Sequence, residues 1–190
     1  MTAICASRGR ESSCEHIRIW TTRGCCGNPE RGADGHAYAS RVDTVRLVVD
    51  DRSGTTEITI SINGTSLIDL ARTVEQPWAD REGKPQLAGS YMGLGPWALG
   101  GSSMHFLGSP HAVWFNDGDT VLLGCDCGEW GCWPLVADII ASDAEVVWTR
   151  FRQGHRDWDL SALGPFIFDR AHYELALQRL DEDLRRYPAG

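Results

Sequence analysis

Three cysteines lie close together in the run Cys125-Asp-Cys127-Gly-Glu-Trp-Gly-Cys132. Side chains alternate along a β-strand, so Cys125 and Cys127 share a face of any strand that contains both. If residues 128–131 form the turn of a hairpin, Cys132 becomes the cross-strand neighbour of Cys127. The spacing therefore predicts that three sulfur atoms converge on one small patch.

Zinc binding is the first chemistry that such a patch could support. Zinc favours four tetrahedral thiolate or imidazole ligands, so three cysteines leave one ligand to be supplied, and a histidine is the natural choice. His155 follows the next predicted strand, and a tight antiparallel turn would return it to the side of Cys132; His111 and His105 are the other candidates. We therefore expect a structural zinc site whose ligands are Cys125, Cys127, Cys132 and His155.

Thiol redox chemistry is the second possibility, with Cys125 and Cys127 cycling between dithiol and disulfide. A disulfide in a C-x-C pair closes a small strained ring and is therefore oxidising and labile. The acidic neighbours Asp126 and Glu129 would raise the thiol pKa values, which argues against a reactive thiolate. Plain packing remains a third interpretation, because cysteine is among the most buried residue types.

Length and composition bound the class of protein. The chain has 190 residues, 42% of them hydrophobic and 23% charged, which fits one globular domain with a core that needs no metal or disulfide. No apolar run is long enough for a membrane span, and the N-terminus lacks the apolar core of a signal peptide. We expect a cytoplasmic protein without membrane contact, whose seven cysteines are thiols or metal ligands.

The net charge of −8 is unevenly distributed. Residues 1–41 carry six arginines against four acidic residues, so residues 42–190 hold a net charge of −10. An acidic surface repels phosphate backbones, which makes nucleic acid a poor partner. A regulatory or immunity-type interaction module that binds a protein partner with a basic surface is therefore a further alternative.

The first 41 residues differ from the rest of the chain. They contain four cysteines, scattered arginines and a run rich in glycine, asparagine and proline at 24–35, and they show little periodicity. We expect residues 1–41 to be a disordered leader and 42–190 to be a single domain. Arginine far outnumbers lysine, as in a GC-rich genome, where valine codons beginning with G-T-G often serve as starts. Val42 is therefore a candidate for the true first residue.

Runs of β-branched residues predict a mixed α+β fold built on antiparallel strands. Strands are expected at 44–50 and 55–62, on either side of a turn that contains Gly54. Three more, separated by short turns, suggest an antiparallel meander at 120–126, 135–141 and 145–151, with a weaker candidate at 112–115. The Gly- and Pro-rich segment 77–110 is expected to be a functional or mobile loop.

Two helices complete the predicted fold. Ser66 can cap a short helix over 67–76 that ends at Pro77. Asp169 can cap a final helix that runs to about residue 186. Its apolar stripe should pack on one face of the sheet, and consists of Tyr173, Leu177, Leu180 and Leu184.

Motifs for other chemistries are weak. The glycines at 93 and 95 break the dinucleotide-binding pattern at its third position, and the chain has no phosphate-loop lysine. His155, Asp157 and Asp159 could serve as acid–base groups, but the polarity of an exposed loop explains them equally well.

The cysteine run, read as far as Trp133-Pro-Leu135, is followed by Phe151-Arg-Gln-Gly-His155-Arg-Asp-Trp158 and by Leu163-Gly-Pro-Phe-Ile-Phe-Asp-Arg170. Together these runs resemble a group of small, uncharacterised actinobacterial proteins that carry a C-x-C-G-x-x-G-C-W-P-L motif. The likeness covers residues 43–180. It implies the same domain limits and a bacterial cytoplasm, and it carries over no catalytic residue.

Overall fold

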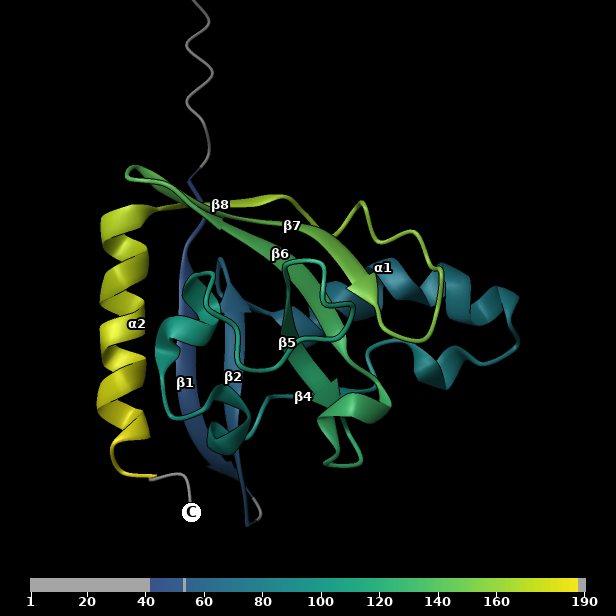
Figure 1. Ribbon diagram of the computed structural model, residues 1–190. Coiled ribbons are helices and arrows are strands. Elements are labelled where there is room, and N and C mark those ends of the chain that lie inside the picture. The colour runs from purple at the N-terminus through teal and green to yellow at the C-terminus, as the bar shows by residue number, and fades with distance from the viewer. Residues whose placement is uncertain (1–41, 53, 188–190) are drawn as a thin grey trace, which may run out of the picture. The chain divides into compact units, whose positions relative to one another are not determined.

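The computed structural model describes residues 42–52 and 54–187, and the strands of this part form two antiparallel sheets. The first sheet has the order β1-β2-β3, and the second has the order β4-β5-β6-β7-β8. Two α-helices, α1 and α2, complete the α+β architecture (Figure 1). The expected leader, residues 1–41, lies outside the described residues, so its disorder and the alternative start at Val42 stay predictions.

The first sheet forms where the β-branched runs predicted it. β1 spans Val45–Arg52 and β2 spans Thr55–Ile62, and Leu47 pairs with Ile60 in the antiparallel register. Alternate residues of β2 are buried, as a strand with one face on the core requires. A two-residue turn then leads into β3, Thr65–Ser66, and both Asn63 and Gly64 have the positive φ that this turn demands.

The second sheet confirms the predicted meander and adds two strands. It consists of β4 (Tyr91–Met92), β5 (Asp119–Cys125), β6 (Leu135–Ala141), β7 (Glu145–Gln153) and β8 (Phe166–Asp169). The weak candidate strand at 112–115 is wrong. The buried Asp119 carboxylate accepts the backbone N–H groups of Trp114 at 2.7 Å and Phe115 at 3.1 Å, and so bends this segment away from a ladder.

The first helix is longer than its sequence predicted. Ser66 caps α1, Leu67–Arg81, by accepting the Ile68 N–H, as expected. The predicted end at Pro77 is wrong, because Pro77 lies inside the helix. An interior proline costs a backbone hydrogen bond, about 3 kcal/mol, but the turn that follows it carries the fully buried Ala79.

The expected loop at 77–110 is largely packed structure. After α1 it contains three short 3-10 helices: η1 (Pro85–Leu87), η2 (Pro96–Leu99) and η3 (Ser103–Leu107). Leu99 and Phe106 from this segment are buried in the core. Single turns of this length show no helical period in a sequence, which explains why only a loop was predicted.

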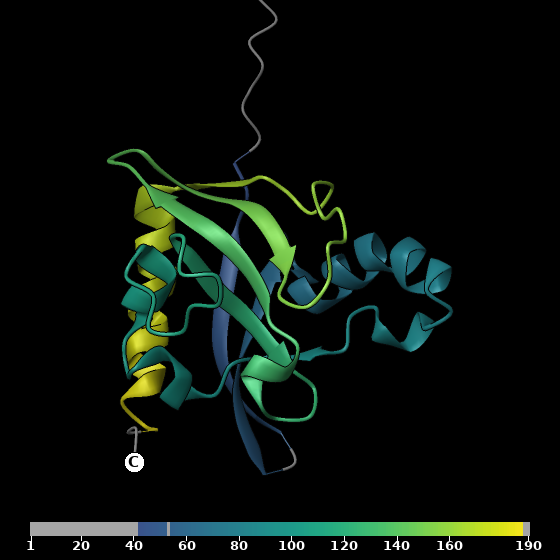
Figure 2. The same cartoon turned by 45° about the vertical axis from the view of Figure 1, so that its right-hand side comes forward.

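The final helix closes the side of the structure between the two sheets. Asp169 caps α2, Arg170–Leu184, by accepting the His172 N–H at 2.9 Å. The two sheets are linked by isolated bridges, from Ile58 to Leu94 and from Asp43 to Phe168. Beyond the second bridge β1 diverges from β8, and Figures 1 and 2 both show α2 lying alongside β1 there. The predicted stripe of α2 is buried: Tyr173, Leu177, Leu180 and Leu184.

Within the described residues, no helix combines the length and the apolar character that crossing a membrane requires.

Candidate functional site

The three cysteines lie in the connection between β5 and β6. Cys125 ends β5, and residues 126–128 turn away from the strand. A 3-10 helix, η4, follows over Trp130–Cys132, and β6 begins only at Leu135. The predicted tight hairpin is therefore wrong, and Cys127 does not face Cys132 in a β-ladder. Pro134, which has no N–H to donate, directly precedes the first residue of β6.

The connection bends because Trp130 packs over the end of β5. A Cβ on Gly124 would lie 2.7 Å from the Trp130 Cα atom, so only glycine admits this approach. The Glu129 side chain caps η4 by accepting the Gly131 N–H. The chain thus folds back over its own strand end, which brings Cys132 towards Cys127 by a route that strand alternation did not foresee.

The three thiols lie close enough to affect one another's acidity through Cys127. The Cys127 N–H donates to the Cys125 Sγ atom at 3.4 Å, and the Cys125 thiol donates to the Asp126 carboxylate at 3.6 Å. All three cysteines are free thiols; Cys127 and Cys132 are exposed, and Cys125 is half-buried. The clustering of sulfurs expected from the spacing is therefore present, with Cys127 at its centre.

The three thiols differ in acidity. Burial raises the pKa of Cys125 to about 11, and the interaction in which Cys132 acts as donor to Cys127 raises the pKa of Cys132. The pKa of Cys127 is lowered, first by the Glu129 backbone N–H and then by hydrogen bonds from the other two thiols. The charge of Asp126 raises this pKa but is outweighed. The expectation that acidic neighbours raise every thiol pKa is therefore wrong for Cys127, which ionises first.

His155 lies against the same connection. Its Nε2 atom is 3.2 Å from the carbonyl oxygen of Gly131, the residue before Cys132. The ring is held edge-on by Trp114, with centroids 4.8 Å apart, and stacks at 6.3 Å with Trp133. Chain order thus correctly placed His155 beside this loop. In the described part of the chain, however, no group of three or more His, Cys, Asp or Glu side chains has an arrangement that could hold a metal ion.

The other two histidine candidates lie elsewhere and serve the fold. His105 is buried, its Nε2 atom is 2.8 Å from the Val121 carbonyl oxygen, and its Nδ1 atom accepts the His111 N–H. Burial lowers the pKa of His105 to about 4, so the ring is neutral at physiological pH.

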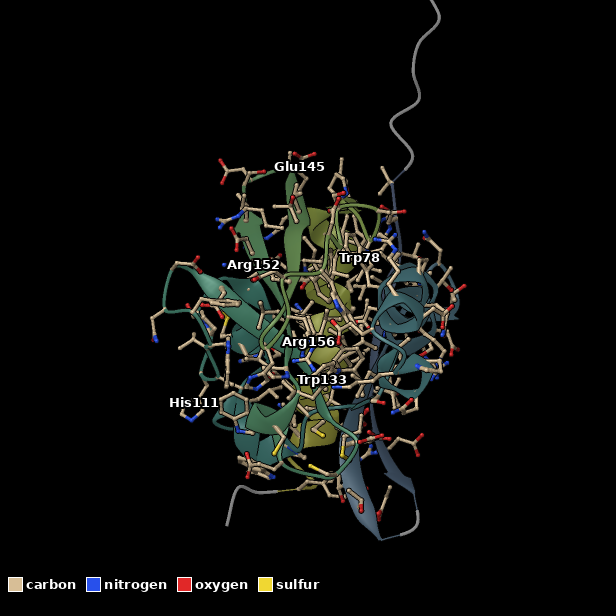
Figure 3. All side chains as sticks on the ribbon, turned by 90° about the vertical axis from the view of Figure 1, so that its right-hand side faces the viewer. Trp78, His111, Trp133, Glu145, Arg152 and Arg156 are labelled. Atoms are coloured by element: carbon tan, nitrogen blue, oxygen red, sulfur yellow. The ribbon has the colours of Figure 1, made fainter. Side chains whose placement is uncertain are left out.

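An anchor that the sequence did not reveal holds the segment containing His155. Glu82, just after α1, accepts the Trp158 indole N–H at 2.7 Å and the Arg156 Nε–H at 3.2 Å. The Arg156 guanidinium lies 5.2 Å from the centre of the Trp133 ring, and Figure 3 shows these two side chains together. Asp159 accepts the Ser161 N–H, which is a turn contact. No local pattern links Glu82 to a segment more than seventy residues away.

A shallow crevice of about 50 Å³ lies beside Cys125, with Met92, Trp97 and Trp130 among its lining residues. It has room for a few water molecules but not for a larger ligand. Ligands at this site would therefore reach the thiols from the open side of the loop, where Cys127 is exposed.

Comparison of the chain with protein-family models, with curated proteins and with solved structures gave no match. The resemblance to small actinobacterial proteins and the expected basic protein partner stay predictions.

Proposed function

We propose that the β5–β6 connection is a structural zinc site with Cys125, Cys127, Cys132 and His155 as its ligands. The observation that supports it best is that the three thiols lie in one connection and affect one another's acidity, with Cys127 interacting with both others. Zinc takes thiolates as ligands and displaces their protons on binding.

The environment of His155 supports its role as the fourth ligand. A histidine that ligates a metal commonly donates its other ring N–H to a carbonyl, which fixes the tautomer. The Nε2–H of His155 can donate to the Gly131 carbonyl oxygen, which leaves Nδ1 with its lone pair. Nδ1 is therefore the atom that would bind the ion.

Zinc would add a fixed point to the exposed part of this connection, which Trp130 and Trp133 already anchor to the core. Residues 126–134 contain one short 3-10 helix, and two of the three cysteines are exposed. Zinc binding would join this connection to the end of β7 through His155, because the free energy of metal binding adds to that of folding.

The test is elemental analysis of the full chain, purified without added metal. We expect stoichiometric zinc in the wild type, none in Cys132→Ser, and a weaker zinc complex in His155→Gln. A variant in which Cys5, Cys14, Cys25 and Cys26 are all serine removes more thiols but leaves the cluster intact, so it should keep its zinc. Cobalt(II) in place of zinc should give thiolate charge-transfer bands that disappear in Cys132→Ser.

Metal-free wild-type protein whose cluster thiols show no affinity for cobalt would refute the proposal. Zinc that stays in Cys132→Ser and leaves with the four N-terminal cysteines would refute it as well, because the ion would then be bound elsewhere. Near-ultraviolet circular dichroism reports whether each variant is folded.

Thiol–disulfide exchange is the second candidate, and the exposure of Cys127 between two other thiols supports it. The Cys127 thiolate would attack a disulfide substrate, form a mixed disulfide and release one thiolate. Cys125 or Cys132 would then attack the Cys127 sulfur and release the second thiolate. The chain ends as a disulfide, and the substrate gains two electrons and two protons.

Glutathione disulfide distinguishes the two functions. If the wild type is an exchange enzyme, its reaction with glutathione disulfide lowers its mass by two hydrogen atoms and releases two glutathione molecules. Cys127→Ser should show neither the mass change nor the release of glutathione. A zinc site gives no such turnover while the metal is bound. If the wild type forms no intramolecular disulfide with this reagent after zinc removal, the exchange function is refuted.

A further inference from the structure

A groove of about 600 Å³ lies between the outer edge of β1 and the helix α2. Five consecutive residues of the chain, 44–48, line one wall, with Ser61 and Gly64 beside them. Successive side chains of a strand point to opposite faces, so a run of consecutive lining residues means that the groove follows the edge of the strand. Ala176, Arg179 and Asp183 of α2 form the opposite wall.

The edge of β1 is open along this groove. β1 is the outermost strand of its sheet, and the bridge at Asp43 is its link to β8. In the described part of the chain, residues 45–48, which line the groove, form no backbone hydrogen bond beyond their pairing with β2. An unpaired strand edge is a template for another extended segment, and a groove between such an edge and a helix is suited to hold one.

Two arginines give the groove a charge opposite to that of the whole domain. Arg46 of β1 and Arg179 of α2 are exposed, and neither has an acidic partner among the described residues. The third charged lining residue, Asp183, pairs with Arg186 at 3.2 Å. Two unpaired cations therefore converge on one groove in a part of the chain with a net charge of −10.

The floor between the charges is apolar. Leu47 and Ala176 are buried, and Val45 and Val48 are half-buried. Pockets for alternate side chains of a strand need such a floor, while the main chain of the ligand pairs with the strand edge.

We propose that this groove binds an extended acidic segment of a partner protein, which adds to β1 as a further strand. Its main chain pairs with the free edge of β1, small apolar side chains contact Val45 and Ala176, and carboxylates pair with Arg46 and Arg179. This proposal is independent of the zinc site, which lies between β5 and β6 and shares no residue with the groove.

The test uses the full chain and a fluorescein-labelled peptide of alternating valine and glutamate, measured by fluorescence anisotropy. We expect saturable binding that weakens as salt is added. The Arg46→Gln/Arg179→Gln double variant should lose between about threefold and about thirtyfold in affinity, as expected for two exposed ion pairs. Arg185→Gln removes the same charge from the end of α2 outside the groove, and should change the affinity less than twofold.

Two altered peptides separate strand addition from charge attraction alone. Glutamine in place of glutamate should weaken binding to the wild type and remove the difference between wild type and double variant. Methylation of alternate backbone nitrogens keeps every charge but blocks the ladder, so it should weaken binding to both proteins. Backbone amide shifts in NMR spectra should change at residues 44–48.

The proposal is overturned if the acidic peptide does not bind at millimolar concentration, or if the double variant binds it as well as Arg185→Gln does. It is also overturned if backbone methylation has no effect, because the peptide would then be an ordinary counter-ion. Dimerisation through β1, or occupation of the groove by residues 1–41 of the same chain, would exclude the probe and would overturn it too.

Discussion

Tyr173→Phe should be among the most destabilising single-atom changes in the protein. The Tyr173 hydroxyl donates to the Phe106 carbonyl oxygen at 2.6 Å and accepts the Trp148 indole N–H at 3.0 Å. Tyr173 is 1% exposed, and the Phe106 and Trp148 side chains are fully buried. One oxygen therefore serves two buried polar groups, on η3 and β7, that water cannot reach.

The magnitude follows from the two groups that lose their partner. A buried donor or acceptor without a partner costs about 1–3 kcal/mol, so two of them should lower the free energy of unfolding by about 2–6 kcal/mol. With a urea dependence of about 2 kcal/mol/M, the midpoint of unfolding should fall by about 1–3 M. This is a large part of the about 5–15 kcal/mol that stabilises a typical domain.

Urea unfolding followed by tryptophan fluorescence measures the change, with Tyr187→Phe as the matched control. The Tyr187 hydroxyl forms no hydrogen bond with the described residues, so its removal should change the free energy of unfolding by less than about 0.5 kcal/mol. If Tyr173→Phe falls in the same range as the control, the hydroxyl is not an essential link between α2 and the core, and the reasoning fails.

Two further predictions concern Glu75 and the cap of α2. Burial raises the pKa of Glu75 above its ordinary value of 4.5, so the folded chain holds this proton more tightly than the unfolded chain. The resulting stabilisation is complete below pH 4.5 and is lost as the pH rises through the folded-state pKa; urea unfolding at several pH values should show that Glu75→Gln removes this decline. Asp169→Ala removes the N-cap of α2 and should cost about 0.5–2 kcal/mol in thermal unfolding, whereas Asp143→Ala, in an exposed turn, should cost almost nothing; equal losses would contradict the cap.

The elements that the sequence predicted well are bounded by local signals. β2 has the predicted limits because Gly54 precedes it and the Asn63–Gly64 turn follows it. β6 begins as predicted because Pro134, just before it, has no N–H to donate to the ladder. The buried stripe and the N-cap of α2 also depend only on spacing within the helix.

The elements that the sequence missed depend on contacts between distant segments. Helix α1 passes through Pro77, and the turn beyond it carries the fully buried Ala79 and leads to Glu82, which bonds to the distant Trp158. The cysteine connection folds back because Trp130 packs on Gly124, and neither residue signals this by its type. The groove between Arg46 and Arg179 depends on β1 and α2, the first and last elements of the described chain, lying side by side.

The position of the cysteine site is set by a buried contact that runs from α1 to the end of β5. Tyr91 of β4 pairs with Cys125 in the ladder, and its hydroxyl donates a short hydrogen bond to the buried Glu75 carboxylate of α1. The other oxygen of Glu75 accepts the Gly89 N–H at 2.8 Å. Because Glu75 holds both the strand partner of Cys125 and the segment leading to it, the base of the thiol cluster is fixed while Cys127 and Cys132 remain exposed. The proposed zinc site would therefore have one ligand held by the fold and two exposed to an incoming ion, and we expect Tyr91→Phe to loosen the one that is held.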